Sequence, residues 1–155
     1  DGILRRHLLG MEPESSSPCT TSYALSTQLV FHYLKREGIS AQFNRNGDLQ
    51  IGNVTFKRLR ERMGGYQNAD TWGYQILLNY RSYGSPETFA SRVTLADVLN
   101  GKFNPNDVRD RIVLIGVTAQ SANDYSLTPF STGKGFYQSI PGVVVQAQMV
   151  SQLLS

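Results

Sequence analysis

The chain has 155 residues, of which 40% are hydrophobic, 10% are aromatic and 17% are charged, and its formal net charge is +3. This length and composition predict one folded domain with a hydrophobic core and argue against a disordered segment. The weak positive charge is not gathered into a basic stripe, so no nucleic-acid partner is expected.

The first elements expected along the chain are a strand and a helix. Apolar positions predict a strand over residues 1–9, and a Pro- and Ser-rich loop follows at residues 12–22. From Tyr23 to Arg36, apolar residues recur at helical spacing and predict a helix. The hydroxyl of Thr21 or Ser22 is expected to cap its first backbone N–H groups.

Strand patterns dominate the middle of the chain. Apolar and polar residues alternate from Phe43 to Phe56, and Asn46-Gly47 lies between the two halves of this pattern. Alternation around an Asn-Gly pair predicts a β-hairpin with a primed turn. The apolar run from Tyr74 to Tyr80 predicts a further strand.

Two helices and a buried strand are expected in the last third. Thr94 precedes a short helical pattern that extends to Leu99, and Thr94 would cap it. The most apolar strand pattern covers Ile112–Ile115 and runs directly into Gly116. Residues 143–154 carry a helical stripe, although the three valines at its start would also suit a strand.

These elements together predict an α/β fold with a mixed, partly parallel sheet, packed helices and an antiparallel hairpin. Strands that are each followed by a turn and a helical pattern favour some parallel pairing. Residues 1–155 are expected to form a single domain. Because the chain opens at Asp1-Gly2 and stops within a helical pattern, we expect it to be a piece of a longer protein.

Polar residues at the ends of the two strongest strands are the candidate ligand-binding residues. Thr118, Asp124 and Thr128 follow the Ile112–Ile115 strand, and Arg81 follows the Tyr74 strand. Open α/β sheets bind ligands at the carboxyl ends of their strands. Two structural alternatives remain: Asp124 could cap backbone amides of its own loop, or it could pair with Arg81.

No pattern for catalysis, metal binding or cofactor binding is found. His7 and His32 have no partner at a metal-ligand spacing, and Cys19, the one cysteine, has no base nearby in the sequence. Gly133-Lys134-Gly135 lacks the strand and the other residues of a phosphate-binding loop. We therefore expect no catalytic residue, no metal and no cofactor, and the chain is not expected to be an enzyme.

Six segments occur in an order that resembles a known family. They are DGILRR at 1–6, ILLNYR at 76–81, TLADVLNG at 94–101, DRIVLIGVTA at 110–119, Asp124 with Thr128-Pro129, and PGVVVQAQMVSQLL at 141–154. Together they resemble the CHASE2 family of extracellular sensory domains, in particular its cyanobacterial members. The resemblance covers nearly the whole chain, and Gly116, Thr118, Asp124, Thr128 and Pro129 match its signature positions.

The resemblance implies a non-catalytic sensory input domain on the extracytoplasmic (periplasmic) face of a membrane-anchored signalling protein. It implies an unknown small-molecule ligand, adjacent transmembrane helices and a cytoplasmic cyclase or kinase output. From its C-terminal position, the helix expected at residues 143–154 is the candidate transmitting helix. CHASE2 domains usually have a further α/β portion upstream of the DGILRR motif, so this chain would be the C-terminal portion. An uncovered sheet edge could then pair two copies into a homodimer.

Two other functions stay open at this point. The chain could be a structural or dimerisation module that binds no ligand, or it could be a small α/β enzyme without a recognisable motif.

Overall fold

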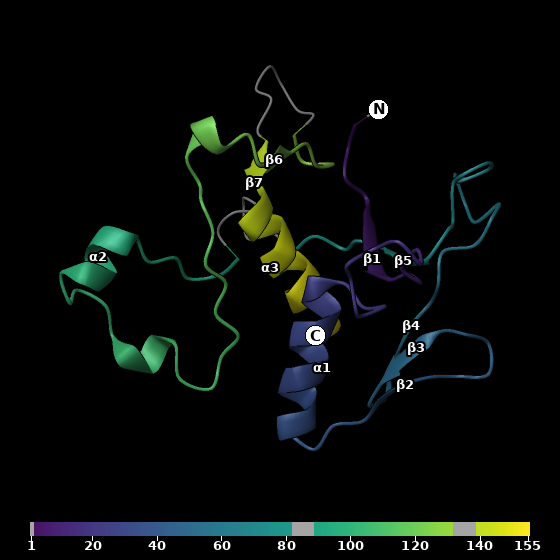
Figure 1. Cartoon of the computed structure of the whole chain (residues 1–155), viewed down its shortest axis with the longest axis horizontal. Coiled ribbons are helices and arrows are strands. Elements are labelled where there is room, and N and C mark those ends of the chain that lie inside the picture. Colours follow the sequence, from purple (N-terminus) through teal and green to yellow (C-terminus); the bar gives the residue numbers. More distant parts are fainter. Residues whose placement is uncertain (1, 82–88, 132–138) are drawn as a thin grey trace.

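The computed structural model describes residues 2–81, 89–131 and 139–155 (Figure 1). These residues form a mixed α/β fold in which the described part of the chain has three α-helices and three small sheets, each of them antiparallel. The described residues contain no parallel sheet, so the prediction of partly parallel pairing is wrong. A single parallel bridge joins Ile3 to Leu127, where the Leu4 N–H donates to the Leu127 carbonyl at 2.8 Å.

The two long helices lie side by side at the centre of Figure 1. Helix α1 spans Leu25–Arg36 and α3 spans Gly142–Leu153, which confirms both predicted helices. The predicted cap of α1 is wrong, because no side chain caps this helix. Instead, the Ala24 N–H donates to the Leu9 carbonyl at 3.0 Å, so the chain enters the helix from a backbone contact with the sheet.

The first sheet pairs two strands that are far apart in the sequence. Strand β1 (Arg6–Gly10) runs antiparallel to β5 (Tyr74–Leu77), with His7 opposite Ile76. The Leu78 N–H continues the pairing by donating to the Arg5 carbonyl at 2.9 Å. The strands predicted near the N-terminus and at Tyr74 are therefore present, and they pair with each other.

The second sheet contains the predicted hairpin. Its strands are β2 (Ala41–Phe43), β3 (Leu49–Ile51) and β4 (Val54–Phe56), all antiparallel. The primed turn is wrong, because both primed types need a positive φ at the first central residue, and Asn46 has none, whereas Gly47 has a φ of 76°. The Asn44 side chain instead accepts hydrogen bonds from the Asn46 and Asp48 N–H groups.

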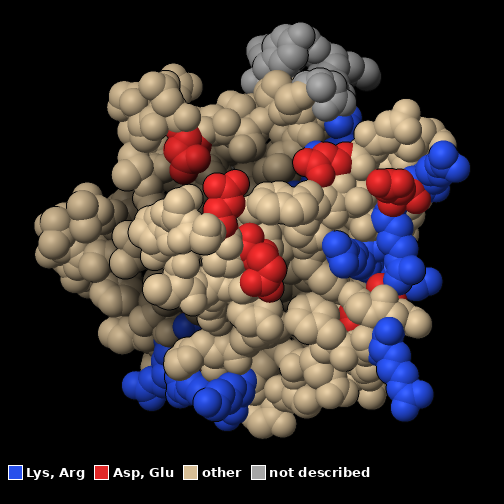
Figure 2. Space-filling model, turned by 45° about the vertical axis from the view of Figure 1, so that its right-hand side comes forward, with Lys and Arg blue, Asp and Glu red and all other residues tan. Residues whose placement is uncertain are grey.

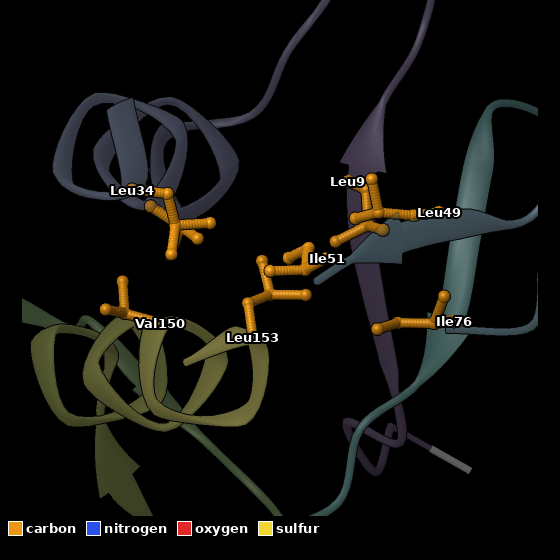
Figure 3. Packing of buried hydrophobic residues seen from close by; sticks show 8 residues of the cluster. Leu9, Leu34, Leu49, Ile51, Ile76, Val150 and Leu153 are labelled. Carbon is orange, nitrogen blue, oxygen red and sulfur yellow. The ribbon is translucent and has the colours of Figure 1, made fainter. Parts of the chain in front are cut away.

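One buried cluster joins both helices to these two sheets (Figure 3). Figure 3 shows side chains from α1 and α3 meeting side chains from β1, β3 and β5. The members are Leu9, Val30, Leu34, Leu49, Ile51, Ile76, Val150 and Leu153. Burial of such aliphatic side chains contributes about 1.5–3 kcal/mol each to folding, so this cluster is the main source of stability.

The remaining elements lie outside the two long helices and the first two sheets. Strands β6 (Tyr125–Ser126) and β7 (Ile140–Pro141) form the third sheet, next to the start of α3. Helix α2 spans Leu95–Leu99 and confirms the predicted short helix, with the Thr94 hydroxyl accepting from the Asp97 N–H at 3.1 Å. The 3-10 helices η1 (Pro105–Asp107) and η2 (Gln120–Ala122) complete the fold.

The strand predicted at Ile112–Ile115 is wrong. Residues 112–119 belong to no strand, and the backbone of residues 112–117 forms no hydrogen bond with any described residue. The described strands pair only with one another, as β1-β5, β2-β3-β4 and β6-β7, and none of them forms a ladder with residues 112–117. We call residues 112–117 the unpaired segment; Figure 1 shows it in green, rising beside α3 between η1 and η2.

Candidate functional site

A hollow lies where the unpaired segment meets the first turn of α3. Its volume is about 240 Å³, and it is open to solvent on one side. Its walls come from the start of α1, the unpaired segment, the loop before β6 and the start of α3. The lining residues are Leu25, Leu114, Ile115, Gly116, Asp124, Gly142, Val143 and Gln146.

Two glycines allow these segments to come together. A Cβ at Gly116 would lie 2.5 Å from the Val143 Cβ, which is closer than two carbon atoms can approach. A Cβ at Gly142 would collide with the Asp124 carboxylate. The Gly142 N–H also donates to the Asp124 carbonyl at 2.9 Å. These close approaches hold both the unpaired segment and Asp124 against the amino end of α3.

Asp124 is the one charged residue of the hollow. It is exposed, and its carboxylate forms neither an ion pair nor a hydrogen bond with any residue in the described parts of the chain. It lies beside the N-terminus of α3, where the helix dipole favours a negative charge. The carboxylate is therefore available to a ligand that enters the hollow.

The other predicted site residues lie elsewhere. Thr118 is exposed just beyond the unpaired segment, and its carbonyl accepts from the Tyr125 hydroxyl at 2.5 Å. Thr128 is buried, and its hydroxyl lies in a turn with Ser131 and the Phe130 N–H. Neither threonine lines the hollow.

Arg81 also does not line the hollow, and it contacts α3 through its backbone. The Gln148 side chain accepts from the Arg81 N–H at 2.9 Å and donates to the Arg81 carbonyl at 2.8 Å. The described residues include no ion pair between Arg81 and Asp124. The structure therefore brings Asp124 together with Gly116 but separates it from the other three predicted residues.

Of the eight residues that line the hollow, sequence reasoning named only Asp124 as a ligand-binding candidate. It named Gly116 as a signature position, and it did not connect Leu25, Gly142, Val143 or Gln146 with the site. The Pro141-Gly142 pair before a helical pattern was the available signal, because such a pair marks the start of a helix where backbone can approach closely. Nothing in the sequence indicates that the start of α1 reaches the same place.

A buried histidine lies outside the hollow. The His7 Nε2 atom is 2.8 Å from the Ser26 hydroxyl, which links β1 to α1. Burial lowers the pKa of His7 to about 4, and the nearby Gln152 side chain opposes this shift. His7 is therefore neutral at pH 7. No group of three His, Cys, Asp or Glu residues in the described regions could hold a metal ion.

The charged surface gives no continuous basic face in the view of Figure 2. Lys and Arg side chains lie in separate groups at the right-hand edge and the lower left, with Asp and Glu side chains between them. No helix in the described part of the chain is long and apolar enough to cross a bilayer.

Comparison with known proteins identifies the family. The family model of the CHASE2 domain matches residues 1–155, the full length of the chain. No curated protein and no solved structure matches significantly. CHASE2 domains are extracytoplasmic sensory domains of signal-transduction proteins and are generally non-catalytic. The resemblance seen in the ordered motifs is thereby confirmed, and the chain belongs to the CHASE2 domain family.

Proposed function

We propose that this CHASE2 domain is the non-catalytic input domain of a membrane-bound signalling protein with a cyclase or kinase output. A small molecule binds in the hollow beside Asp124 and sets the state of that output. The observation that carries this proposal is a free carboxylate at a hollow walled in part by the last helix of the chain.

The lining of the hollow supports a particular class of ligand. Leu25, Leu114 and Val143 provide apolar walls, and Gln146 adds an amide that can donate or accept. The Asp124 carboxylate accepts hydrogen bonds and attracts positive charge. The matching ligand is a small molecule with a cationic or N–H donating group at one end and an apolar group at the other.

Thr118, Thr128 and Arg81 have positioning roles in this proposal. The Thr118 carbonyl is tied to Tyr125, which follows Asp124 directly. Arg81 is tied to α3 through Gln148, and Thr128 stabilises the turn after β6. These contacts hold the segments around the hollow, whereas Asp124 contacts the ligand.

Transmission follows from the position of α3. Gly142, Val143 and Gln146 lie in its first turns, while Leu114 and Gly116 lie in the unpaired segment. The two segments are adjoining walls that touch at Gly116 and Val143, and a ligand that contacts both stabilises one arrangement of α3 relative to the unpaired segment. Unequal affinity for two arrangements is the requirement for a ligand-driven switch. Because α3 packs along α1, a shift of α3 also changes the packing between the two helices.

A thermal-shift screen tests the proposal. The 155-residue chain is melted with a panel of small amines, amino acids and inorganic cations, next to the Asp124→Asn and Asp107→Asn variants. Asp107 is also exposed and belongs to η1, away from the hollow, so its variant controls for the lost charge.

We expect at least one amine to raise Tm for the wild type and for Asp107→Asn but not for Asp124→Asn. A ligand at about 100 times its Kd stabilises the folded state by about 2.7 kcal/mol, which is readily measured as a shift in Tm. A panel without any stabiliser, or equal stabilisation of Asp124→Asn, contradicts a ligand site at this carboxylate.

A further inference from the structure

The unpaired segment carries apolar side chains that nothing in the described structure covers. Val113, Ile115 and Val117 are 53%, 96% and 62% exposed. Ile112 and Leu114 are half-buried, and Ile112 packs against the main core cluster. Side chains therefore alternate between an inward and an outward direction, as they do in a β-strand.

The backbone of the unpaired segment is equally uncovered. None of its N–H and C=O groups bonds to a described residue, although the segment is apolar and alternates between half-buried and exposed side chains from Ile112 to Ile115. Open strand edges of this kind pair with other strands. The missing neighbour is therefore another extended strand rather than a helix or a small molecule.

The order of side chains indicates which strand would fit. The outward residues read Val113, Ile115, Val117, which is the same in both directions. When such a strand meets its own copy antiparallel, with a two-fold axis at Ile115, each outward β-branched residue faces another one. Ile115 faces Ile115, and Val113 faces Val117. Cross-strand pairs of this type stabilise sheets.

The side chains on the inward face of the unpaired segment also fit the antiparallel pairing with its axis at Ile115. Leu114 of one copy lies opposite Gly116 of the other, so the large side chain faces the residue without one. A shift of the axis to Leu114 or to Val113 would instead place the Arg111 side chain opposite Val117 or Ile115. Such a shift loses an apolar pair and buries a charge next to aliphatic groups, which is unfavourable.

The geometry points to a homodimer of this domain, in which two unpaired segments form an antiparallel two-stranded sheet about a two-fold axis at Ile115. The interface is self-complementary, so the assembly closes at two copies. Leu114, Ile115 and Gly116 also line the hollow, so the second copy lies along one of its walls. The inference rests on the unpaired segment alone and does not depend on whether the hollow binds a ligand.

Disulfide trapping tests the register. In a Cys19→Ser background, Ile115→Cys places two thiols opposite each other, with Cβ atoms about 4.5–5.5 Å apart, which is close enough for a disulfide after small adjustments. Val113→Cys alone meets Val117 of the other copy, so it has no partner thiol. Leu99→Cys on α2 is a control at another apolar residue that is 77% exposed.

We expect Ile115→Cys to form covalent dimers at least about ten-fold faster than Val113→Cys or Leu99→Cys under mild oxidation. An equimolar mixture of Val113→Cys and Val117→Cys chains should cross-link at about half the rate of Ile115→Cys and faster than either variant alone, because about half of its dimers carry one chain of each kind. Cross-linking of Ile115→Cys at the control rate overturns the proposed register.

Sedimentation measures the dimer without any cross-link. The wild type is expected to be dimeric at roughly 100 µM protein, and Ile115→Arg monomeric, whereas Leu99→Arg stays dimeric. Because Ile115 is almost fully exposed, its substitution removes little packing within one chain. A wild type that remains monomeric at this concentration, or an Ile115→Arg variant that remains dimeric, overturns the inference.

Discussion

Gly116 packs against Val143 so closely that no side chain larger than hydrogen fits at position 116. A methyl group at position 116 would lie 2.5 Å from the Val143 Cβ and 2.7 Å from its Cγ2. Val143 is held by the first turn of α3, so it cannot move aside without the helix. The unpaired segment and the first turn of α3 therefore pack directly against each other at this contact.

Gly116→Ala should separate the unpaired segment from α3. We expect the free energy of unfolding to fall by about 1–3 kcal/mol, as for other overpacked contacts. Urea unfolding measures this change. Gly65→Ala is the matched control, because nothing lies within 4 Å of its added Cβ, and we expect it to be nearly neutral. Equal stability of Gly116→Ala and the wild type would show that the contact is loose.

Gly142→Ala should behave differently, because its obstacle is an exposed carboxylate rather than a helix residue. The Asp124 side chain can rotate away, and alanine favours a helix by about 1 kcal/mol over glycine. We therefore expect little change in the free energy of unfolding but loss of the ligand-induced rise in Tm. Retention of the full ligand response would mean that the carboxylate position does not matter for binding.

His7 should make stability depend on pH. Its pKa falls from 6.5 in the unfolded chain to about 4 in the fold because it is buried. The unfolded state then binds more protons between these values, so the free energy of unfolding decreases as pH falls through this window. The loss due to this group is roughly 3 kcal/mol by pH 4.

Unfolding measured from pH 7 to pH 4 tests this assignment. His7→Gln should flatten the pH dependence even if it lowers stability overall. His32→Gln, at the exposed histidine of α1, is the matched variant for comparison. An unchanged slope in His7→Gln would assign the acid sensitivity to other groups.

Gln148 should be important for stability because both ends of its amide bind the Arg81 backbone. Gln148→Leu keeps the size of the side chain but leaves that N–H and C=O without these partners. We expect a loss of about 1–3 kcal/mol in the free energy of unfolding. Gln42→Leu on the exposed side of β2 is the control and should cost little. If both variants lose the same free energy of unfolding, the hydrogen bonds between Gln148 and the Arg81 backbone do not contribute to stability.

The helices could be predicted from the sequence because their signals are local. The apolar spacing in α1 and α3 and the Thr94 cap of α2 each lie within one short stretch of chain. The strand partners could not be predicted, because β1 and β5 meet across more than sixty residues, with Arg6 opposite Leu77. The apolar pattern at Ile112–Ile115 predicted a strand, and the side chains there do alternate between half-buried and exposed. The pattern could not show that no described strand pairs with this segment.

The candidate site was predicted in part for the same reason. Asp124 is recognisable because it is the only charge in a polar loop, and that is a local feature. Its neighbours Leu25 and Gly142 come from the starts of two helices that are far apart in the sequence. The alternative of an ion pair between Asp124 and Arg81 is not found among the described residues, and the Arg81 backbone is instead bound to Gln148 on α3.

Ligand recognition at the hollow is tested most directly by a backbone-amide NMR titration of the 155-residue chain with the amine that raises Tm most. The proposal predicts saturable shift changes centred on Gly116, Asp124, Gly142 and Val143, with smaller changes continuing along α3, and none of these in Asp124→Asn. Shift changes confined to other surfaces, or no saturable change at all, would contradict the proposal.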